Sequence, residues 1–122
     1  MNFVQGFVLA VPTANREVYA AYAARMWPLF RKYGALRLFE SWGVEVPDGK
    51  LTSFPMAVKL APDETVVFAW IEWPDRDSAM RCHGSFGTDP DWEMVGDVRD
   101  NMPFDGVRMI FGDFVPIVDL RA

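Results

Sequence analysis

Four segments of the chain are apolar on both sides of a β-strand, and this feature limits the folds that the chain can adopt. A strand with one face in water alternates apolar and polar residues, whereas a strand covered on both faces is an almost continuous apolar run. The four runs occupy residues 3–11, 36–46, 66–73 and 107–118. Only two segments have the spacing of helices that can cover a sheet. Both helices fit on one face, so the other face needs a cover from outside the chain, most simply a second copy.

The helical segments lie between the strands in a recognisable order. The first helix is predicted over about residues 15–33, with Gly34 as its C-terminal cap and a kink at Pro28. The second begins after Asp75, and a short third helix is predicted within residues 89–100. The resulting order, βαββαβ, is that of ferredoxin-like α+β folds with a four-stranded antiparallel sheet. The length of 122 residues fits a single domain over residues 1–122.

The alternation of side chains along each strand predicts which residues share a face of the sheet. One face has small residues at its centre, and we expect the helices to pack there. This face comprises Val4, Gly6, Val8, Phe39, Ser41, Gly43, Val67, Ala69, Ile71, Ile110, Gly112 and Phe114. The other face mixes aromatic side chains with carboxylates, in the set Gln5, Phe7, Leu9, Leu38, Glu40, Trp42, Phe68, Trp70, Glu72, Phe111 and Asp113. Such a mixture favours a partly enclosed cavity or a subunit interface.

Charge and cysteine content restrict the partners and the compartment. The net charge is −5, and no cluster of Lys and Arg offsets it, so we expect no nucleic acid partner. Charged residues also interrupt the chain too often for a membrane protein. A single cysteine, Cys82, excludes an intrachain disulfide and fits a reducing compartment. The apolar run at residues 3–11 has no preceding basic region, so we interpret it as a strand and predict a cytoplasmic protein.

Two long segments resemble a known family. Residues 52–71, TSFPMAVKLAPDETVVFAWI, and residues 102–114, MPFDGVRMIFGDF, are similar to signature segments of the YbaA-like family of uncharacterised bacterial proteins, as are residues 33–36 and 46–50. The resemblance implies the dimeric α/β-barrel superfamily, in which two ferredoxin-like subunits pack sheet to sheet. That superfamily includes cofactor-free monooxygenases, haem-handling enzymes and isomerase-like proteins, so the implied fold does not select a reaction. Residues 75–100 match the family least well.

The candidate catalytic residues are one histidine and three acids. His83 is the single histidine and is a candidate general base, although its place on the apolar stripe of a helix favours a structural role. Glu40, Glu72 and Asp113 are the candidate acids. If two of them meet in a cavity, the pKa of one rises toward use in acid–base chemistry. The alternative is that these acids are edge carboxylates that reach solvent or form an ion pair with Arg37 or Arg108, and we favour the ion pair for at least two of the three.

An aromatic pocket is the predicted ligand site. Its expected contacts are Phe7, Trp42, Trp70, Arg108 and Phe111, although core and interface packing also explains the aromatic residues. The chain has no phosphate-binding glycine loop, nucleophile elbow, HExxH motif or set of zinc ligands, so we predict no cofactor and no metal.

These patterns favour a homodimer that binds a small, mainly apolar molecule. The alternatives are a cofactor-independent monooxygenase or isomerase that uses one of the three acids as base, and a structural or regulatory interaction module without a ligand. We expect the subunit contact to bury more than about 2,000 Å² in total.

Overall fold

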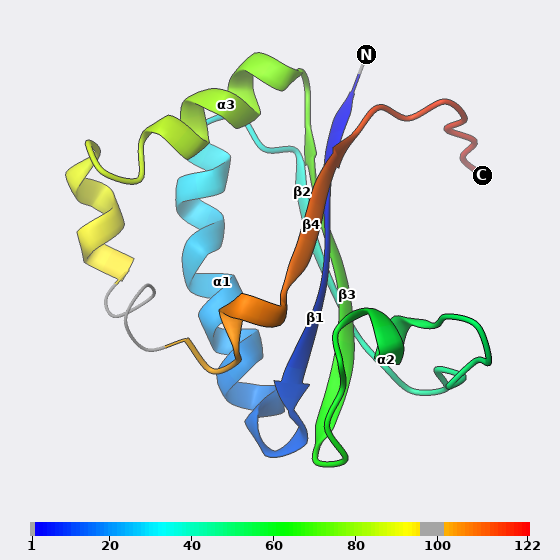
Figure 1. The fold of residues 1–122 in the computed structure, drawn as a ribbon. Coiled ribbons are helices and arrows are strands. Elements are labelled where there is room, and N and C mark those ends of the chain that lie inside the picture. The colour runs from blue at the N-terminus through cyan, green and yellow to red at the C-terminus, as the bar shows by residue number, and fades with distance from the viewer. Residues whose placement is uncertain (1, 96–101) are drawn as a thin grey trace.

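The computed structural model describes residues 2–95 and 102–122 (Figure 1). The strands are β1 (Phe3–Pro12), β2 (Arg37–Trp42), β3 (Glu64–Trp73) and β4 (Ile110–Phe114). The α-helices are α1 (Arg16–Lys32), α2 (Phe54–Ala57) and α3 (Arg76–Gly84), and the 3-10 turns are η1 (Thr13–Asn15), η2 (Pro90–Val95) and η3 (Gly106–Arg108).

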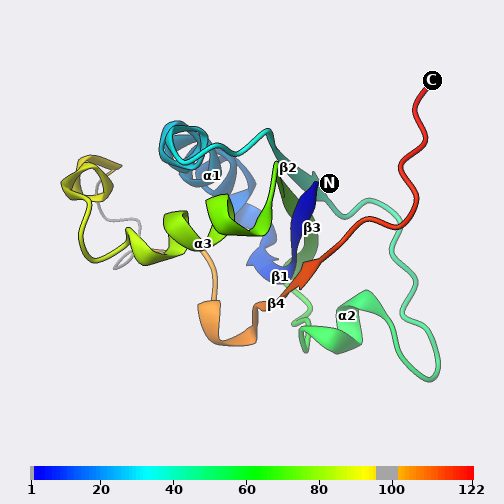
Figure 2. The same cartoon turned by 90° about the horizontal axis from the view of Figure 1, so that it is seen from above.

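The strands form one antiparallel sheet in the order β2-β3-β1-β4. Helices α1 and α3 lie on one side of this sheet, the helix face, in both views (Figures 1 and 2). Helix α2 and the segment after β4 lie on the other side, the open face. The predicted βαββαβ order and the four-stranded antiparallel sheet are therefore confirmed.

Helix α1 packs on the sheet through an apolar stripe. Tyr19, Tyr22, Leu29 and Phe30 recur at helical spacing, and all four are buried. Pro28 lies within the helix near its C-terminal end, as predicted.

Helix α3 also begins as predicted. The carboxylate of Asp75 accepts a hydrogen bond of 2.7 Å from the backbone N–H of Ser78.

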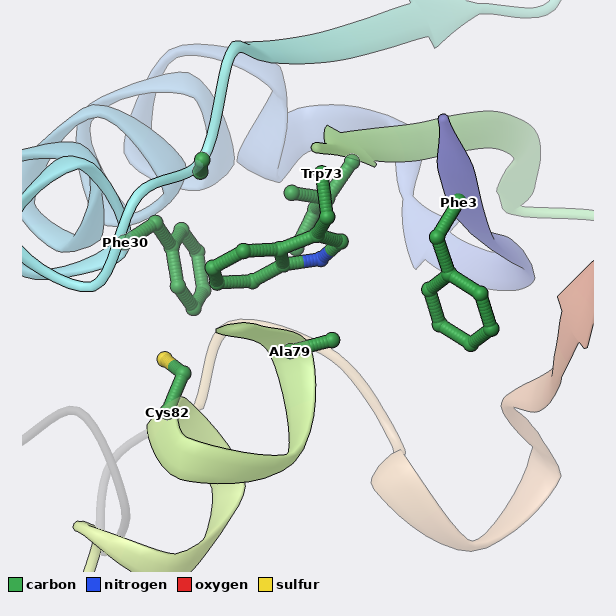
Figure 3. Close-up of a cluster of buried hydrophobic side chains, with 7 residues drawn as sticks. Phe3, Phe30, Trp73, Ala79 and Cys82 are labelled. Carbon is green, nitrogen blue, oxygen red and sulfur yellow. The ribbon is translucent and has the colours of Figure 1, made fainter. Parts of the chain in front are cut away.

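The core between the sheet and the helices is centred on Trp73. This residue is fully buried at the end of β3, and its ring meets the edge of Phe30 at a centroid distance of 6.4 Å. Figure 3 shows Ala79 and Cys82 on the turn of α3 that faces the indole. A second buried cluster joins Leu9 and other sheet residues to Tyr19 and Tyr22 of α1.

Helix α2 is a feature that the sequence pattern did not predict. The side chain of Ser53 accepts a hydrogen bond from the N–H of Met56, and Pro55 lies in the first turn, where its missing N–H leaves no bond unmade. Directly after this short helix, Val58 is fully buried against Val8 and Val66. One part of the open face is therefore covered by this chain itself.

The predicted assignment of residues to the two faces is wrong in part. The register pairs Phe7 with Ala69 and with Phe111, so odd-numbered residues of β1 and β3 share a face. The prediction displaced β3 by one residue relative to its neighbours. It also placed the helices over the small-residue set, whereas α1 and α3 cover the face of Gln5, Phe7 and Leu9. Alternation fixes the faces within one strand, but pairing between strands sets the offset.

The glycines that suggested close helix packing accommodate an aromatic ring instead. Gly6 of β1 lies opposite Gly112 of β4 on the open face. A Cβ atom on either glycine would come within 3.3 Å of the Phe114 ring. The ring lies against the bare backbone of the two strands, so the missing side chains make room for Phe114 and not for a helix.

The last strand is shorter than predicted. Residues 107–118 were expected to be extended, but the pairing with β1 covers only Ile110–Phe114. Asp105 accepts a hydrogen bond of 3.0 Å from the N–H of Val107, and this bond caps η3. Arg108 therefore lies in a turn ahead of the sheet.

Candidate functional site

A cluster of polar side chains surrounds Gln5 on the helix face, where β1 meets β4. Gln5 is only 4% exposed, and its amide makes three side-chain contacts. The indole Nε1–H of Trp73 donates to Gln5 Oε1 at 2.9 Å. Gln5 Nε2 lies 2.8 Å from His83 Nε2 and donates to Asp113 Oδ1 at 3.3 Å. The Gln5 cluster thus connects the core, helix α3 and the edge strand β4.

An aromatic pair lies beside the Gln5 cluster on the same face. The register places Gln5 opposite Asp113 and Phe7 opposite Phe111, so the four side chains form a two-by-two block. The rings of Phe7 and Phe111 are 6.5 Å apart between centroids. Phe111 is 70% exposed. The block therefore has an apolar half that is open to solvent and a polar half in which the side chains are held by hydrogen bonds.

The three candidate acids do not meet. Asp113 belongs to the Gln5 cluster, Glu40 lies on the helix face of the opposite edge strand, β2, and Glu72 lies on the open face. None of the three makes an ion pair with another described residue, so the pairing expected with Arg37 or Arg108 is wrong. Glu72 lies directly opposite Arg37 in the register, yet no ion pair joins the two side chains.

Glu40 is paired with a tyrosine. The hydroxyl of Tyr19 in α1 donates to Glu40 Oε1 at 2.6 Å. Although Glu40 is exposed overall, packed neighbours partly desolvate its carboxyl and raise its pKa above the ordinary value, while the bond from Tyr19 opposes the shift. Burial and the nearby carboxylate also raise the pKa of Tyr19. The pair joins α1 to β2 and lies away from the Gln5 cluster.

The predicted aromatic pocket is divided between different places. Trp42 lies on the helix face of β2, with the guanidinium of Arg16 at 5.7 Å from its ring. Trp70 lies on the open face, where it stacks on Phe39 at 4.4 Å and donates to Glu72 at 3.2 Å. Of the four predicted aromatic contacts, only Phe7 and Phe111 are brought together.

Arg108 anchors the turn before β4. It forms two bonds with the carboxylate of Glu64, at 2.8 and 2.6 Å, and one of 2.9 Å with Asp105. The guanidinium lowers the pKa of both acids. These contacts hold η3 against the start of β3, so the structure gives Arg108 a structural contact and not the predicted place in an aromatic pocket.

Cys82 and its neighbour His83 point in different directions. Cys82 is fully buried against the Trp73 core, and burial raises the pKa of its thiol to about 12. The thiol is therefore protonated and unreactive at neutral pH. His83 is exposed, with its ring 5.5 Å from that of Phe86. Adjacent residues of a helix diverge, so the two do not form a dyad.

A groove of about 650 Å³ lies between the end of the sheet and the segment that follows β4. Its lining mixes apolar and charged side chains, among them Val4, Arg37, Glu72, Val118 and Arg121. One wall belongs to a segment whose apolar side chains Ile117 and Leu120 are almost fully exposed. Val4, Arg37 and Glu72 lie on the open face, so this groove borders the surface expected to meet a second subunit.

The described residues, 2–95 and 102–122, contain neither a cluster of metal-ligating side chains nor a candidate membrane-spanning helix. In these ranges no three His, Cys, Asp or Glu side chains are grouped as a metal site. In the same ranges no helix is long and apolar enough to cross a membrane.

The central residue of the cluster, Gln5, was not among the predicted site residues. The signal in the sequence is the single polar residue within the apolar run at residues 3–11. A buried polar side chain needs hydrogen-bond partners, but the sequence did not reveal that these would be Trp73 and His83.

The comparisons with known proteins identify the family. Residues 2–106 match the family described as Protein of unknown function (DUF1428). The chain is 45% identical to the uncharacterized protein YbaA of Escherichia coli over 119 residues. This alignment covers 98% of this chain and 99% of YbaA. YbaA of Shigella flexneri gives the same identity and coverage.

Two solved structures share the fold. A dimeric ferredoxin-like protein from an uncultured marine organism superposes with a TM-score of 0.52 at 11% identity, covering 98% of both chains. A mutant of SnoaB, a cofactor-independent oxygenase from Streptomyces nogalater, gives a TM-score of 0.53 at 18% identity, covering 99% of this chain and 98% of SnoaB. With the match over residues 2–106 and the 45% identity to YbaA, the chain belongs to the DUF1428 family.

Proposed function

We propose that the protein is a homodimer that binds a small, mainly apolar molecule at the Gln5 cluster and the adjacent Phe7–Phe111 pair. The observation that carries the ligand proposal is the two-by-two block on the helix face. It places a solvent-exposed aromatic surface directly beside a buried amide that orients two polar side chains. Binding sites combine apolar walls with a few fixed polar groups in this way.

The homodimer proposal rests on the open face. We call Phe39, Phe68, Trp70, Ile110 and Phe114 the open-face group. Phe68 and Ile110 are each 44% exposed and Phe114 is 59% exposed, although all three belong to a sheet. A contiguous apolar surface of this kind is typical of a subunit contact. The similar fold of a protein described as dimeric supports the same assembly.

Light scattering on the wild type and two variants tests the dimer. We expect a mass of twice 13.9 kDa at micromolar concentration, and monomers for Phe68→Glu and Phe114→Glu, because each variant buries a charge in the contact. Val107→Glu is the matched control, since Val107 is 93% exposed in η3 and lies outside the open-face group. A wild-type monomer would contradict the proposal.

A thermal-shift screen of small metabolites tests the ligand site. A ligand at a hundred times its Kd adds about 2.7 kcal/mol to the stability of the native state. Each compound that raises Tm is then tested on Phe111→Ala, which removes the exposed ring, and on Val118→Ala, which changes the groove at the open face. We expect the first variant, and not the second, to abolish the shift.

If Val118→Ala abolishes the shift and Phe111→Ala does not, the ligand site is in the groove at the open face. If no compound binds, the result would favour the remaining alternative, a structural or regulatory interaction module without a ligand.

A second candidate function is a cofactor-independent oxygenase or isomerase. The observation that favours it is the carboxylate of Asp113, which lies next to the aromatic pair and is held through one oxygen by Gln5. Asp113 is therefore the candidate base, and the similar fold of an oxygenase that works without a cofactor is compatible with this role. Conversion of a bound compound, lost in Asp113→Asn while binding persists, would support the enzyme.

We also propose a cytoplasmic location. Its support is the single cysteine, which is buried as a free thiol and is not used for cross-linking. Fractionation of cells that produce the protein, with recovery in the cytosolic fraction, tests this location.

A further inference from the structure

The orientation of the Gln5 amide is fixed by its buried partner. The indole N–H of Trp73 can only donate a hydrogen bond, so the atom of Gln5 at 2.9 Å must be the carbonyl oxygen. The NH₂ group therefore faces the other two partners, His83 and Asp113. Its two hydrogens match these two acceptors, so every polar atom of this buried side chain has a partner.

This orientation determines which nitrogen of His83 carries the proton. The amide nitrogen of Gln5 donates at 2.8 Å, so the facing Nε2 of His83 must supply a lone pair. The imidazole is then neutral with its hydrogen on Nδ1. Nδ1 lies on the far side of the ring from Gln5, and in the described part of the chain no group accepts a hydrogen bond from it. Exposed His83 therefore offers a donor to the surroundings.

The second partner offers the complementary group. Asp113 uses Oδ1 toward Gln5 and is exposed, so its other oxygen remains an acceptor. A donor on His83 and an acceptor on Asp113 thus lie on either side of one amide. The exposed ring of Phe111 adjoins them on β4.

We propose that Gln5 is a positioning residue that holds His83 in the Nδ1–H form, and that the site takes aromatic molecules bearing both a carbonyl and a hydroxyl group. The ring packs on Phe7 and Phe111, the carbonyl accepts from His83 Nδ1, and the hydroxyl donates to Asp113. The assignment of the ligand class rests on the proposed function, whereas the role of Gln5 does not.

Nitrogen NMR of the imidazole tests the role of Gln5. His83 is the single histidine, so untagged protein grown with ¹⁵N-histidine gives imidazole signals from this residue alone. We expect the two nitrogen shifts of the Nδ1–H form in the wild type at neutral pH. The Nε2–H form, or shifts averaged by rapid exchange between the two forms, would overturn the assignment.

Two variants separate positioning from general packing. Gln5→Glu replaces the donor by a carboxylate that accepts from Trp73 and from His83, so the proton should move to Nε2. Gln5→Leu removes both the donor and the acceptor, so His83 should exchange between the Nδ1–H and Nε2–H forms. Retention of the Nδ1–H form in either folded variant would show that Gln5 does not set it. If neither variant folds, the wild-type spectrum still decides the assignment.

A matched series of probes tests the ligand class. The probes are 3- and 4-hydroxyacetophenone, acetophenone without the hydroxyl, and phenol without the carbonyl. We expect at least one hydroxyacetophenone to bind the wild type about tenfold more tightly than either simpler probe, since each added hydrogen bond contributes roughly one power of ten. Asp113→Asn should reduce the advantage over acetophenone, and Phe111→Ala should weaken all the probes.

The outcomes of the series distinguish the two proposals. Equal binding of all four probes, still dependent on Phe111, would overturn the ligand class and leave the proposed site intact. Binding of no probe, together with an Nδ1–H signal and an unproductive metabolite screen, would overturn the proposed site and leave the role of Gln5 in place.

Discussion

Among single residues, Glu40 predicts the direction in which the stability of the protein changes with pH. Its pKa is raised in the folded protein, first by desolvation, so the native state binds more protons than the unfolded state. The associated stabilisation is present at low pH and is lost as the pH rises through the folded pKa. Glu40→Gln keeps an oxygen that accepts from Tyr19 and removes the titration. The free energy of unfolding of the variant, relative to that of the wild type, should therefore increase as the pH rises from 4 to 7.

Urea unfolding across that pH range measures the difference in the free energy of unfolding. A free energy of unfolding of Glu40→Gln that, relative to the wild type, stays constant or falls as the pH rises would contradict the desolvation of Glu40. Tyr19→Phe provides a second check, because loss of the opposing hydrogen bond should steepen the pH dependence of the wild-type acid.

The contacts of Arg108 predict the opposite pH dependence of stability. Arg108 lowers the pKa of Glu64, so the unfolded state binds more protons than the native state as the pH falls through that range. The stabilisation is present at neutral pH and is lost in acid. Arg108→Met should lower the denaturation midpoint at pH 7, and the deficit should shrink as the pH falls below the ordinary value for glutamate.

A matched control exists for this arginine. Arg121 also pairs with an aspartate, Asp119, but its side chain is 72% exposed. Arg121→Met should leave the midpoint at pH 7 unchanged, because solvent screens an exposed pair. An equal loss in both variants would mean that the geometry of the Arg108–Glu64 pair adds nothing.

Among the elements, the segment around α2 has a structural role that its length does not suggest. Val58 follows α2, is fully buried and closes one end of the open face against Val8 and Val66. Val58→Ala should lower the free energy of unfolding by about 2 kcal/mol through the lost contacts and the cavity left behind. Val44→Ala makes the same change at a residue that is 89% exposed, and should have no measurable effect.

The elements also show how far sequence patterns determine this structure. Long apolar runs predicted β1 and β3, and a capping aspartate predicted the start of α3. Helix α2 was missed because four residues held by Ser53 give no helical period. The site was predicted only in part. Phe7, Phe111, Asp113 and His83 were candidates, but the face of each depends on how strands pair, and that pairing is decided by contacts far apart in the sequence.

In the molecule as a whole, the position of Gly112 gives a test of assembly. On the open face it makes room for the Phe114 ring, which is itself more than half exposed and free to turn aside. Gly112→Leu should therefore change the unfolding of the isolated subunit little, but the displaced ring should weaken the dimer at least about tenfold. Sedimentation over a range of concentrations measures the dissociation constant. An unchanged constant would place the subunit contact elsewhere.

The position of β1 inside the sheet has a consequence for the way the chain is synthesised. This strand, which is synthesised before the other three strands of the sheet, has β3 on one side and β4 on the other. One of its edges thus stays unpaired until residues 110–114 have been made, and an unpaired edge of an apolar strand invites association with other chains. Pairing of segments so distant in sequence is also slow to form. Nascent chains stalled before residue 110 should therefore engage chaperones, and release from them should coincide with the appearance of β4.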